Sequence, residues 1–156
     1  MTDAESTLII RLWSEGDIET IRNFVVTLAE FEKEPEAVTA THENYVEAYK
    51  SGFISGHLAL LDEKPVGMTL FYENFSTWKG KMLYLEDFIV LDEYRRLGIG
   101  QKLFEAFESE ASKRNCTTLK WQVLDWNQTA ISFYKKNGAD IQTQWWTCRK
   151  YASDRQ

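Results

Sequence analysis

One stretch of the chain, residues 82–100, constrains the fold more than any other. Residues 82–91 are almost all apolar or aromatic, which is typical of a strand covered on both faces. An Arg/Gly-rich loop follows, and the start of the helix predicted behind it offers backbone N–H groups suited to an anion. Two carboxylates, Glu86 and Asp87, interrupt the strand, although burying an unpaired carboxylate is costly. The pair therefore indicates either an exposed edge or bulge of a sheet, or a functional site.

The length and charge of the chain narrow the class of protein. A chain of 156 residues fits a single domain, 1–156, and 44% hydrophobic with 27% charged residues is a globular balance. The net charge of −6 argues against nucleic acid as a partner; it mildly favours a cationic partner, or it only aids solubility. Six Trp, seven Tyr and nine Phe exceed the usual needs of a core this size, so some are expected to line a pocket.

Several classes of site are not predicted. Cys116 and Cys148 lack a metal-binding spacing, so we expect reduced thiols in a cytoplasmic protein. His42 and His57 are isolated, so neither a metal cluster nor a His-based triad is expected. No apolar run reaches the roughly 18 residues of a membrane span, and we expect neither a signal peptide nor a membrane partner.

The order of predicted elements indicates a mixed α/β (α+β) sheet with helices on its faces. In chain order we expect a strand at 8–13, helices at about 18–34 and 41–52, strands at 57–61, 66–75 and 82–91, a helix at 99–115, a strand at 118–124, a helix at 127–136, and a last strand or two at 141–151. The three strands of the meander pair antiparallel, but a strand–helix–strand unit needs a parallel neighbour. Strands 82–91 and 118–124 should therefore lie side by side, with their carboxyl ends at an edge where ligands bind.

The loop after strand 82–91 carries a family resemblance. Its sequence, Arg95-Arg96-Leu97-Gly98-Ile99-Gly100, matches the Arg/Gln-x-x-Gly-x-Gly/Ala motif of the GNAT acetyltransferase superfamily. The element order also resembles that family over nearly the whole chain. The resemblance implies the GNAT fold: a mixed central sheet of about six to seven strands, flanked by four helices, with the fourth and fifth strands splayed apart.

Three further segments resemble one branch of that superfamily. Tyr84-Leu85-Glu86-Asp87-Phe88, Trp126-Asn127 and Phe133-Tyr134-Lys135 look like the diamine (spermidine/spermine) acetyltransferases and their thialysine acetyltransferase relatives. Ser76-Thr77-Trp78-Lys79-Gly80 and Val123-Leu124-Asp125-Trp126-Asn127-Gln128 favour the thialysine branch. By resemblance we also expect a homodimer.

The resemblance implies that acetyl-CoA is the cofactor and that the start of helix 99–115 holds its pyrophosphate. From Glu86 to Val90 is about 13 Å of strand, enough for the extended pantetheine arm to lie along it. Asn127 is implied to contact the cofactor, and its position also suits a helix N-cap. The full set of expected cofactor-binding residues is Phe88, Ile89, Val90, Arg95, Arg96, Leu97, Gly98, Ile99, Gly100, Gln101, Asn127, Thr129, Ala130, Tyr134 and Lys136.

Two residues are expected to move protons. A primary ammonium has a pKa of about 10.4, so a base must take its proton before the amine can attack, and Glu86 is the expected base, directly or through a water. Tyr134 is expected to protonate the leaving thiolate, because a phenol with a pKa of about 10 is a competent acid towards a thiol with a pKa of about 8.5. Tyr134 can equally be a core tyrosine on a helix face.

The expected acceptor is a small cationic amine. Glu32, Glu86 and Asp87 offer negative charge, while Phe31, Trp78 and either Trp145 or Trp146 offer apolar or cation–π walls. Gln144-Trp145-Trp146 stands where the polyamine enzymes tend to carry extra acid, which leaves thialysine, lysine-like amines and short diamines open. Two alternatives are a GNAT-fold module that binds acyl-CoA without turnover, and a protein N-terminal or lysine acetyltransferase.

Overall fold

The computed structural model describes residues 4–152. These residues fall into two compact units, the first ending at Trp121 and the second beginning at Gln122. The first unit contains the whole sheet, and the second contains one helix and a long irregular segment. The expectation of a single domain over residues 1–156 stays a prediction.

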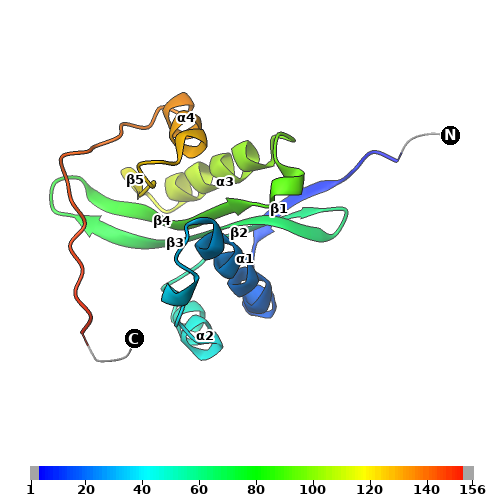
Figure 1. Ribbon diagram of the computed structural model, residues 1–156, viewed down its shortest axis with the longest axis horizontal. Coiled ribbons are helices and arrows are strands. Elements are labelled where there is room, and N and C mark those ends of the chain that lie inside the picture. The colour runs from blue at the N-terminus through cyan, green and yellow to red at the C-terminus, as the bar shows by residue number, and fades with distance from the viewer. Residues whose placement is uncertain (1–3, 153–156) are drawn as a thin grey trace. The chain divides into compact units, whose positions relative to one another are not determined.

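The first unit is built on a five-stranded sheet with the order β1-β2-β3-β4-β5 (Figure 1). Its strands are β1 (Leu8–Leu12), β2 (His57–Leu61), β3 (Lys64–Ser76), β4 (Gly80–Val90) and β5 (Thr118–Trp121). Its helices are α1 (Ile18–Phe31), α2 (His42–Lys50) and α3 (Ile99–Lys113), with short 3-10 helices η1 (Glu15–Asp17), η2 (Pro35–Ala37) and η3 (Asp92–Tyr94). The first three strand pairings are antiparallel and β4 pairs with β5 in parallel, which confirms the predicted meander and its parallel neighbour.

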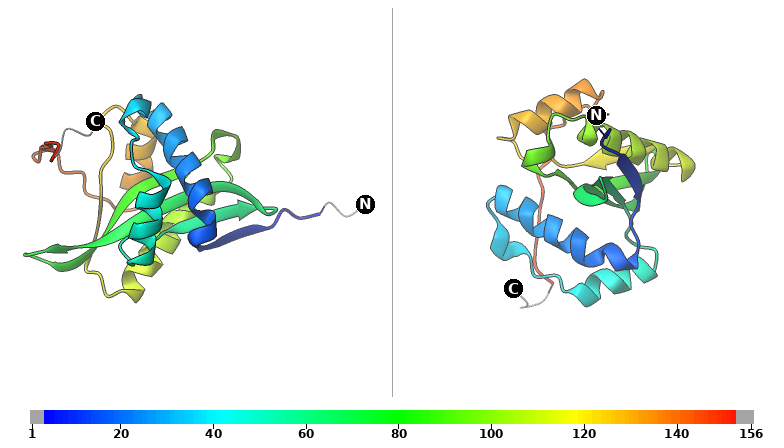
Figure 2. Two further views of the ribbon diagram at one scale, coloured as in Figure 1. Left: turned by 90° about the horizontal axis from the view of Figure 1, so that it is seen from below. Right: turned by 90° about the vertical axis from the view of Figure 1, so that its right-hand side faces the viewer.

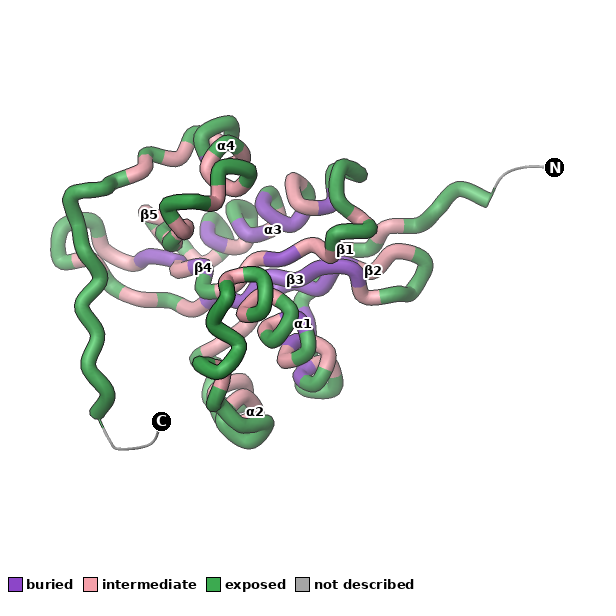
Figure 3. Tube along the Cα trace, viewed as in Figure 1, coloured by how far each residue is buried: buried purple, intermediate pink, exposed green. Residues whose placement is uncertain are grey.

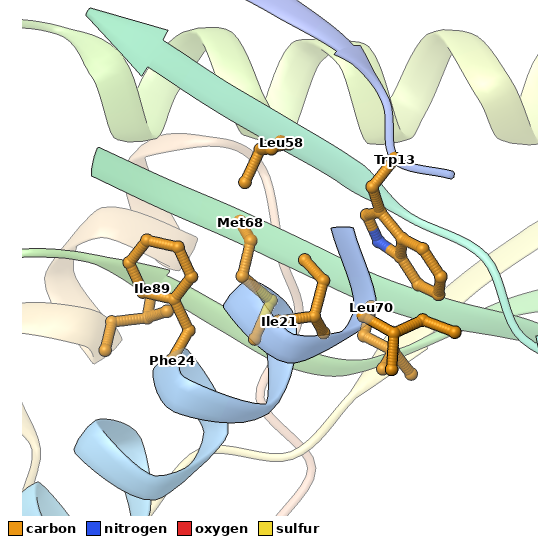
Figure 4. Close-up of a cluster of buried hydrophobic side chains, with 8 residues drawn as sticks. Trp13, Ile21, Phe24, Leu58, Met68, Leu70 and Ile89 are labelled. Atoms are coloured by element: carbon orange, nitrogen blue, oxygen red, sulfur yellow. The ribbon is translucent and has the colours of Figure 1, made fainter. Parts of the chain in front are cut away.

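Helices α1 and α2 cover one face of this sheet, and α3 covers the other (Figure 2, right). On the first face, Ile18, Ile21 and Phe24 recur at helical spacing on α1 and are buried. They pack with Trp13, and with Leu58, Met68, Leu70 and Ile89 from three neighbouring strands (Figure 4). We call this side the α1 face of the sheet.

The opposite face is closed by α3, whose predicted apolar stripe is confirmed. Ile99 and Leu103 are buried against Ala59 and Val66 of the sheet. Further along the helix, Phe107 packs on Phe71 of β3 with ring centroids 5.6 Å apart. The buried residues therefore lie mainly in β2, β3 and β4 and on the side of α3 that faces the sheet (Figure 3).

The helix starts of the first unit follow the predicted capping pattern. The Ser14 backbone N–H donates to Asp17 Oδ2 at 2.7 Å, just before α1. At α2 the bonds are reciprocal: Asn44 N–H donates to Thr41 Oγ1, and Thr41 N–H donates to Asn44 Oδ1. Gly52 ends this helix with a φ of 76°, a left-handed conformation that glycine adopts readily.

The second unit contains α4 (Gln128–Lys136), close to the predicted helix. The Ala130 N–H donates to the side chain of Asn127 at 3.2 Å, so Asn127 is the N-cap. Gly138 follows the helix with a φ of 84°.

At the carboxyl end one predicted strand is shorter than expected and another prediction is wrong. The strand expected at 118–124 ends at Trp121, because a turn begins at Leu124, whose carbonyl accepts the Asn127 N–H. The expected strand or strands at 141–151 do not form; these residues are irregular and almost entirely exposed. A suitable composition does not make a strand unless a neighbour completes the hydrogen-bond ladder. The described residues therefore hold five strands and four α-helices, rather than six to seven strands.

Nowhere in residues 4–152 does the chain form a helix with the length and apolar character needed to cross a membrane.

Candidate active site

The two carboxylates of β4 lie at a β-bulge. Leu70 of β3 pairs with Asp87, whereas the next residue, Phe71, pairs with Leu85, so Glu86 is the extra residue of β4. Asp87 therefore shares the α1 face with its partner Leu70, and Glu86 reaches Tyr72 two residues further along β3. The bulge breaks the usual alternation and brings two successive carboxylates to one face.

Three carboxylates meet there, and we call Glu32, Glu86 and Asp87 the acidic site. Glu32 follows directly on α1, and both burial and the charge of Glu86 raise its pKa. Burial also raises the pKa of Asp87 to about 7, with further contributions from Glu86 and Glu32. Glu86 itself is exposed, so the prediction of a fully covered strand is wrong at the bulge. The site is open to solvent at Glu86 and more enclosed at Asp87.

Tyrosines from two other elements border the acidic site. The Tyr72 hydroxyl of β3 donates to Glu86 Oε2 at 3.2 Å. Tyr45 of α2 has its pKa raised by burial and by the charges of Asp87 and Glu86. The sequence did not single out either tyrosine: Tyr72 lies on the α1 face by strand alternation, but its pairing with Glu86 depends on the bulge.

The raised pKa of Asp87 predicts a pH-dependent stability. A carboxyl whose pKa is higher in the folded than in the unfolded state stabilises the fold at low pH, and that contribution is lost as pH rises through the folded value. Relative to Asp87→Asn, the native protein should lose about 1 to 3 kcal/mol of unfolding free energy between pH 5 and pH 8. Urea unfolding at both pH values measures this, with Asp125→Asn as a control for removing an exposed carboxylate. A difference between native and Asp87→Asn that is equal at the two pH values would contradict the assignment.

The loop of residues 95–98 lies at the other end of this region. The Arg95 Nε–H donates to the Val90 carbonyl at 3.3 Å, and its guanidinium carbon lies 5.7 Å from the centroid of the Phe31 ring. Arg96 and Gly98 both have positive φ, 66° and 78°. These two left-handed residues turn the chain into α3, at the place where the Arg/Gly-rich sequence predicted a loop.

The start of α3 fits an anionic group such as a pyrophosphate. Gly98 is the N-cap and has no side chain to occupy the first free N–H groups of the helix. The first turn carries Gln101 and Lys102 rather than acidic residues, so the positive end of the helix dipole is not neutralised. At Gly100 an added Cβ would be in ordinary van der Waals contact, 3.7 Å from the Phe88 ring and 3.8 Å from Val90.

Gly98→Val should lower the affinity for acetyl-CoA at least about tenfold. Valine is strained at a φ of 78°. If the backbone shifts to relieve this strain, the N–H groups turn away from the anion, and each hydrogen bond that is lost is one to a charged group. Gly52→Val is a matched control, because Gly52 also has a positive φ, 76°, and open space around its Cα. Calorimetry should show weakened binding in Gly98→Val and native binding in Gly52→Val. Equal affinities in two folded variants would exclude the loop as the anion site.

Strand β4 extends beyond its pairing with β5. The parallel pairing of the two strands ends at Leu85 and Trp121, whereas β4 continues to Val90. Ile89 is buried on the α1 face, whereas Phe88 and Val90 pack towards α3. Residues 86–90 thus connect the acidic site with the loop along one strand.

The remaining predicted residues have mixed locations. Phe31 is partly exposed and lies under Arg95, next to Glu32, so it borders both the loop and the acidic site. Trp78 is 82% exposed at the β3–β4 turn, about 20 Å of strand from Glu86, and is not brought to the acidic site.

Three predicted cofactor residues lie at or near the start of α3. Leu97 is exposed in the loop, and Ile99, the first residue of α3, is buried in the core between the helix and the sheet. The Gln101 side chain donates to Glu105.

Within the second unit, α4 carries the other predicted residues. Thr129 and Ala130 lie in its first turn, and Lys136 is its last residue. Tyr134 is 8% exposed, and its ring meets that of Phe133 edge-on at 5.6 Å. Trp146 is 90% exposed in the irregular segment.

Comparisons with known proteins agree on one family. The family model described as "Acetyltransferase (GNAT) family" matches residues 18–139. The chain is 34% identical over 160 residues to the thialysine N-epsilon-acetyltransferase of Bos taurus, with 94% of each chain covered. It is 35% identical over 116 residues to the enzyme of that name from Caenorhabditis elegans, covering 74% of this chain and 72% of that protein.

Solved structures share the fold. The aminoglycoside N-acetyltransferase AAC(6')-Iy in complex with CoA superimposes with a TM-score of 0.78 at 14% identity. The match covers 96% of this chain and 99% of that one.

Proposed function

Because the chain belongs to the GNAT acetyltransferase family and is an N-acetyltransferase, we propose that it transfers acetyl from acetyl-CoA to the terminal primary amine of a small cationic acceptor. The observation that carries this proposal is the convergence of Glu32, Glu86 and Asp87 at one bulge. Carboxylates this close together repel one another, and the repulsion raises the pKa of Glu32 and of Asp87 in addition to the effect of burial. A cationic ligand offsets this repulsion.

The cofactor would be held by the loop of residues 95–98 and the start of α3. The backbone N–H groups of that helix start would bind the pyrophosphate, and Arg95 and Arg96 would supply positive charge beside it. The backbone of residues 88–90 would guide the extended arm. When bound, acetyl-CoA supplies an activated acetyl thioester.

Glu86 would act as the general base. Its carboxylate is exposed and held by the Tyr72 hydroxyl, so an incoming ammonium group can reach it. Taking one proton from the ammonium leaves a neutral amine with a free lone pair, which is the nucleophile that acyl transfer needs.

Tyr134 would act as the general acid. This assignment rests on the resemblance of the segment around α4 to the diamine and thialysine enzymes. Its phenolic hydroxyl would supply the proton that the departing thiolate needs. Asn127, Thr129, Ala130 and Lys136 would bind the cofactor beside it.

Asp87 and Glu32 would bind the acceptor rather than react with it. A second cationic group on the acceptor offsets the repulsion between these carboxylates, whereas a neutral acceptor does not. Two relatives that each match most of this chain bear the name thialysine N-epsilon-acetyltransferase, which favours thialysine or a lysine-like amine. Phe31 provides an apolar wall beside Glu32.

A transfer screen tests the proposal. The enzyme is incubated with acetyl-CoA and, in turn, thialysine, lysine, putrescine, spermidine and spermine, and the products are identified by mass spectrometry. We expect acetylation of a terminal amine, fastest with thialysine or a lysine-like amine. Acetyl-CoA binding without transfer would indicate a non-catalytic module, and transfer only to peptides would indicate a protein acetyltransferase. The homodimer and the cytoplasmic location stay predictions.

A further inference from the structure

Three aromatic rings stack beside Glu86, and we call Phe53, Tyr72 and Tyr84 the aromatic row. Tyr72 and Tyr84 pair directly across β3 and β4, and their ring centroids lie 5.3 Å apart at an interplanar angle of 30°. Phe53 stacks on Tyr72 with centroids 5.5 Å apart at 17°. Because the Tyr72 hydroxyl donates to Glu86 Oε2 at 3.2 Å, the aromatic row is joined to the acidic site.

Phe53 is the most exposed ring of the aromatic row. It lies in the turn between α2 and β2, and two backbone hydrogen bonds between Ser55 and Phe71, 3.1 and 2.8 Å long, hold this segment beside β3. Phe53 is 60% exposed, although Tyr72 covers one face of its ring. It therefore presents an open aromatic surface at a fixed place near the acidic site.

The negative charge of the acidic site extends over the aromatic row. Burial and the charge of Glu86 raise the pKa of Tyr72, to about 12, and also the pKa of Tyr84. Both rings are therefore neutral phenols at neutral pH, and they lie in a negative potential. An aromatic face attracts a cation, and a nearby carboxylate adds to that attraction.

The order of residues along β4 indicates which part of the acceptor would meet the aromatic row. The cofactor arm would occupy residues 88–90, and the reacting amine would lie at Glu86. Tyr84 precedes Glu86 in the strand, so it lies on the side away from the cofactor. The remainder of the acceptor has to extend away from the thioester, and in that direction it meets the stacked rings.

We propose that the aromatic row is a subsite for the second ammonium group of the acceptor, and that Phe53 determines its specificity. This inference rests on the proposed acetyl transfer and locates the far end of the acceptor. The acidic site would supply the charge that attracts the acceptor, and the aromatic row would distinguish an amine with two cationic ends from a simple monoamine.

Phe53→Leu tests the proposal, because it keeps an apolar side chain, removes the aromatic face and leaves the hydrogen bond between Tyr72 and Glu86 in place. Calorimetry on the enzyme saturated with CoA measures the affinity for cadaverine and for n-pentylamine, which share one carbon chain and differ in the second ammonium group. We expect native enzyme to bind cadaverine more tightly. Phe53→Leu should reduce this preference about two- to fivefold, the range of a cation–π contact at an exposed site.

Two further variants sharpen the test. Phe53→Trp should keep or increase the preference for cadaverine, because indole binds cations best among the aromatic side chains. Phe75→Leu is the matched control: Phe75 is 73% exposed on β3, and strand alternation places it with Phe71 on the side of the sheet that α3 covers. It should keep the native affinity for both amines, and circular dichroism should show that all three variants are folded.

Three results would overturn the inference: an unchanged preference in Phe53→Leu, an equal loss of affinity for both amines, or the same change in Phe75→Leu. Each of them leaves the proposed function standing, because acetyl transfer is measured separately in the screen. Native enzyme that transfers acetyl to none of the amines in the screen fails the proposed function instead.

Discussion

Tyr134→Phe should lower kcat by about 10² to 10⁴ while leaving the KM for the amine nearly unchanged. The substitution removes only the phenolic hydroxyl, so the leaving thiolate must depart without its proton donor. Phenylalanine keeps the ring, which meets Phe133 edge-on and is 8% exposed, so the α4 helix should remain intact. Steady-state kinetics with the best amine acceptor measures both parameters.

The effect should also depend on pH in a specific direction. At low pH, solvent protonates the departing thiolate more readily, so the ratio of native to Tyr134→Phe kcat should shrink as pH falls. Tyr151→Phe is the matched control, because Tyr151 is also in the second unit but is 61% exposed, and this variant should behave as native. Native kcat in Tyr134→Phe across the whole pH range would refute the acid role.

The cofactor loop and its flanking elements could be read from the sequence because their signals are local. A run of apolar residues, two glycines and an amphipathic stripe each act within a few residues, and together they predict β4, the turn and α3. Gly98 takes the left-handed conformation that this interpretation needs. The capping bonds at Ser14 and Thr41 are likewise set by neighbours in the chain.

The chemistry of the acidic site could be predicted only in part. Glu86 and Asp87 stood out because carboxylates are rare in apolar strands, and Glu32 was expected beside them. A bulge was one interpretation of the Glu86-Asp87 pair, but the sequence could not decide for it, because a bulge depends on how β3 and β4 register, which is a property of two strands together. Tyr72 was missed for that reason, since a tyrosine in a strand is otherwise unremarkable.

The carboxyl-terminal strands failed for a different reason. Residues 141–151 contain aromatic and apolar residues that suit a strand, yet a strand exists only where another chain segment completes its hydrogen bonds. Composition predicts the ability to pair and says nothing of the presence of a partner. The same limit shortened the strand expected at 118–124, where the turn at Leu124 intervenes.

Glu86→Gln should have an effect as large as Tyr134→Phe, about 10² to 10⁴ in kcat at neutral pH, because it removes the base and keeps the shape of the side chain. Its activity should recover partly at high pH, where more of the acceptor is already a free amine. Asp87→Asn should instead raise the KM for the amine more than it lowers kcat, because it removes binding that the ground state and the transition state share.

The most direct test of the account is therefore the pH profile of kcat and KM for native, Glu86→Gln and Asp87→Asn enzymes with the best amine from the screen. We predict a collapse of kcat at pH 7 with partial recovery at high pH for Glu86→Gln, and chiefly a raised KM for Asp87→Asn. Native kcat at pH 7 in Glu86→Gln would contradict the account, since the base would then lie elsewhere and the acidic site would serve binding alone.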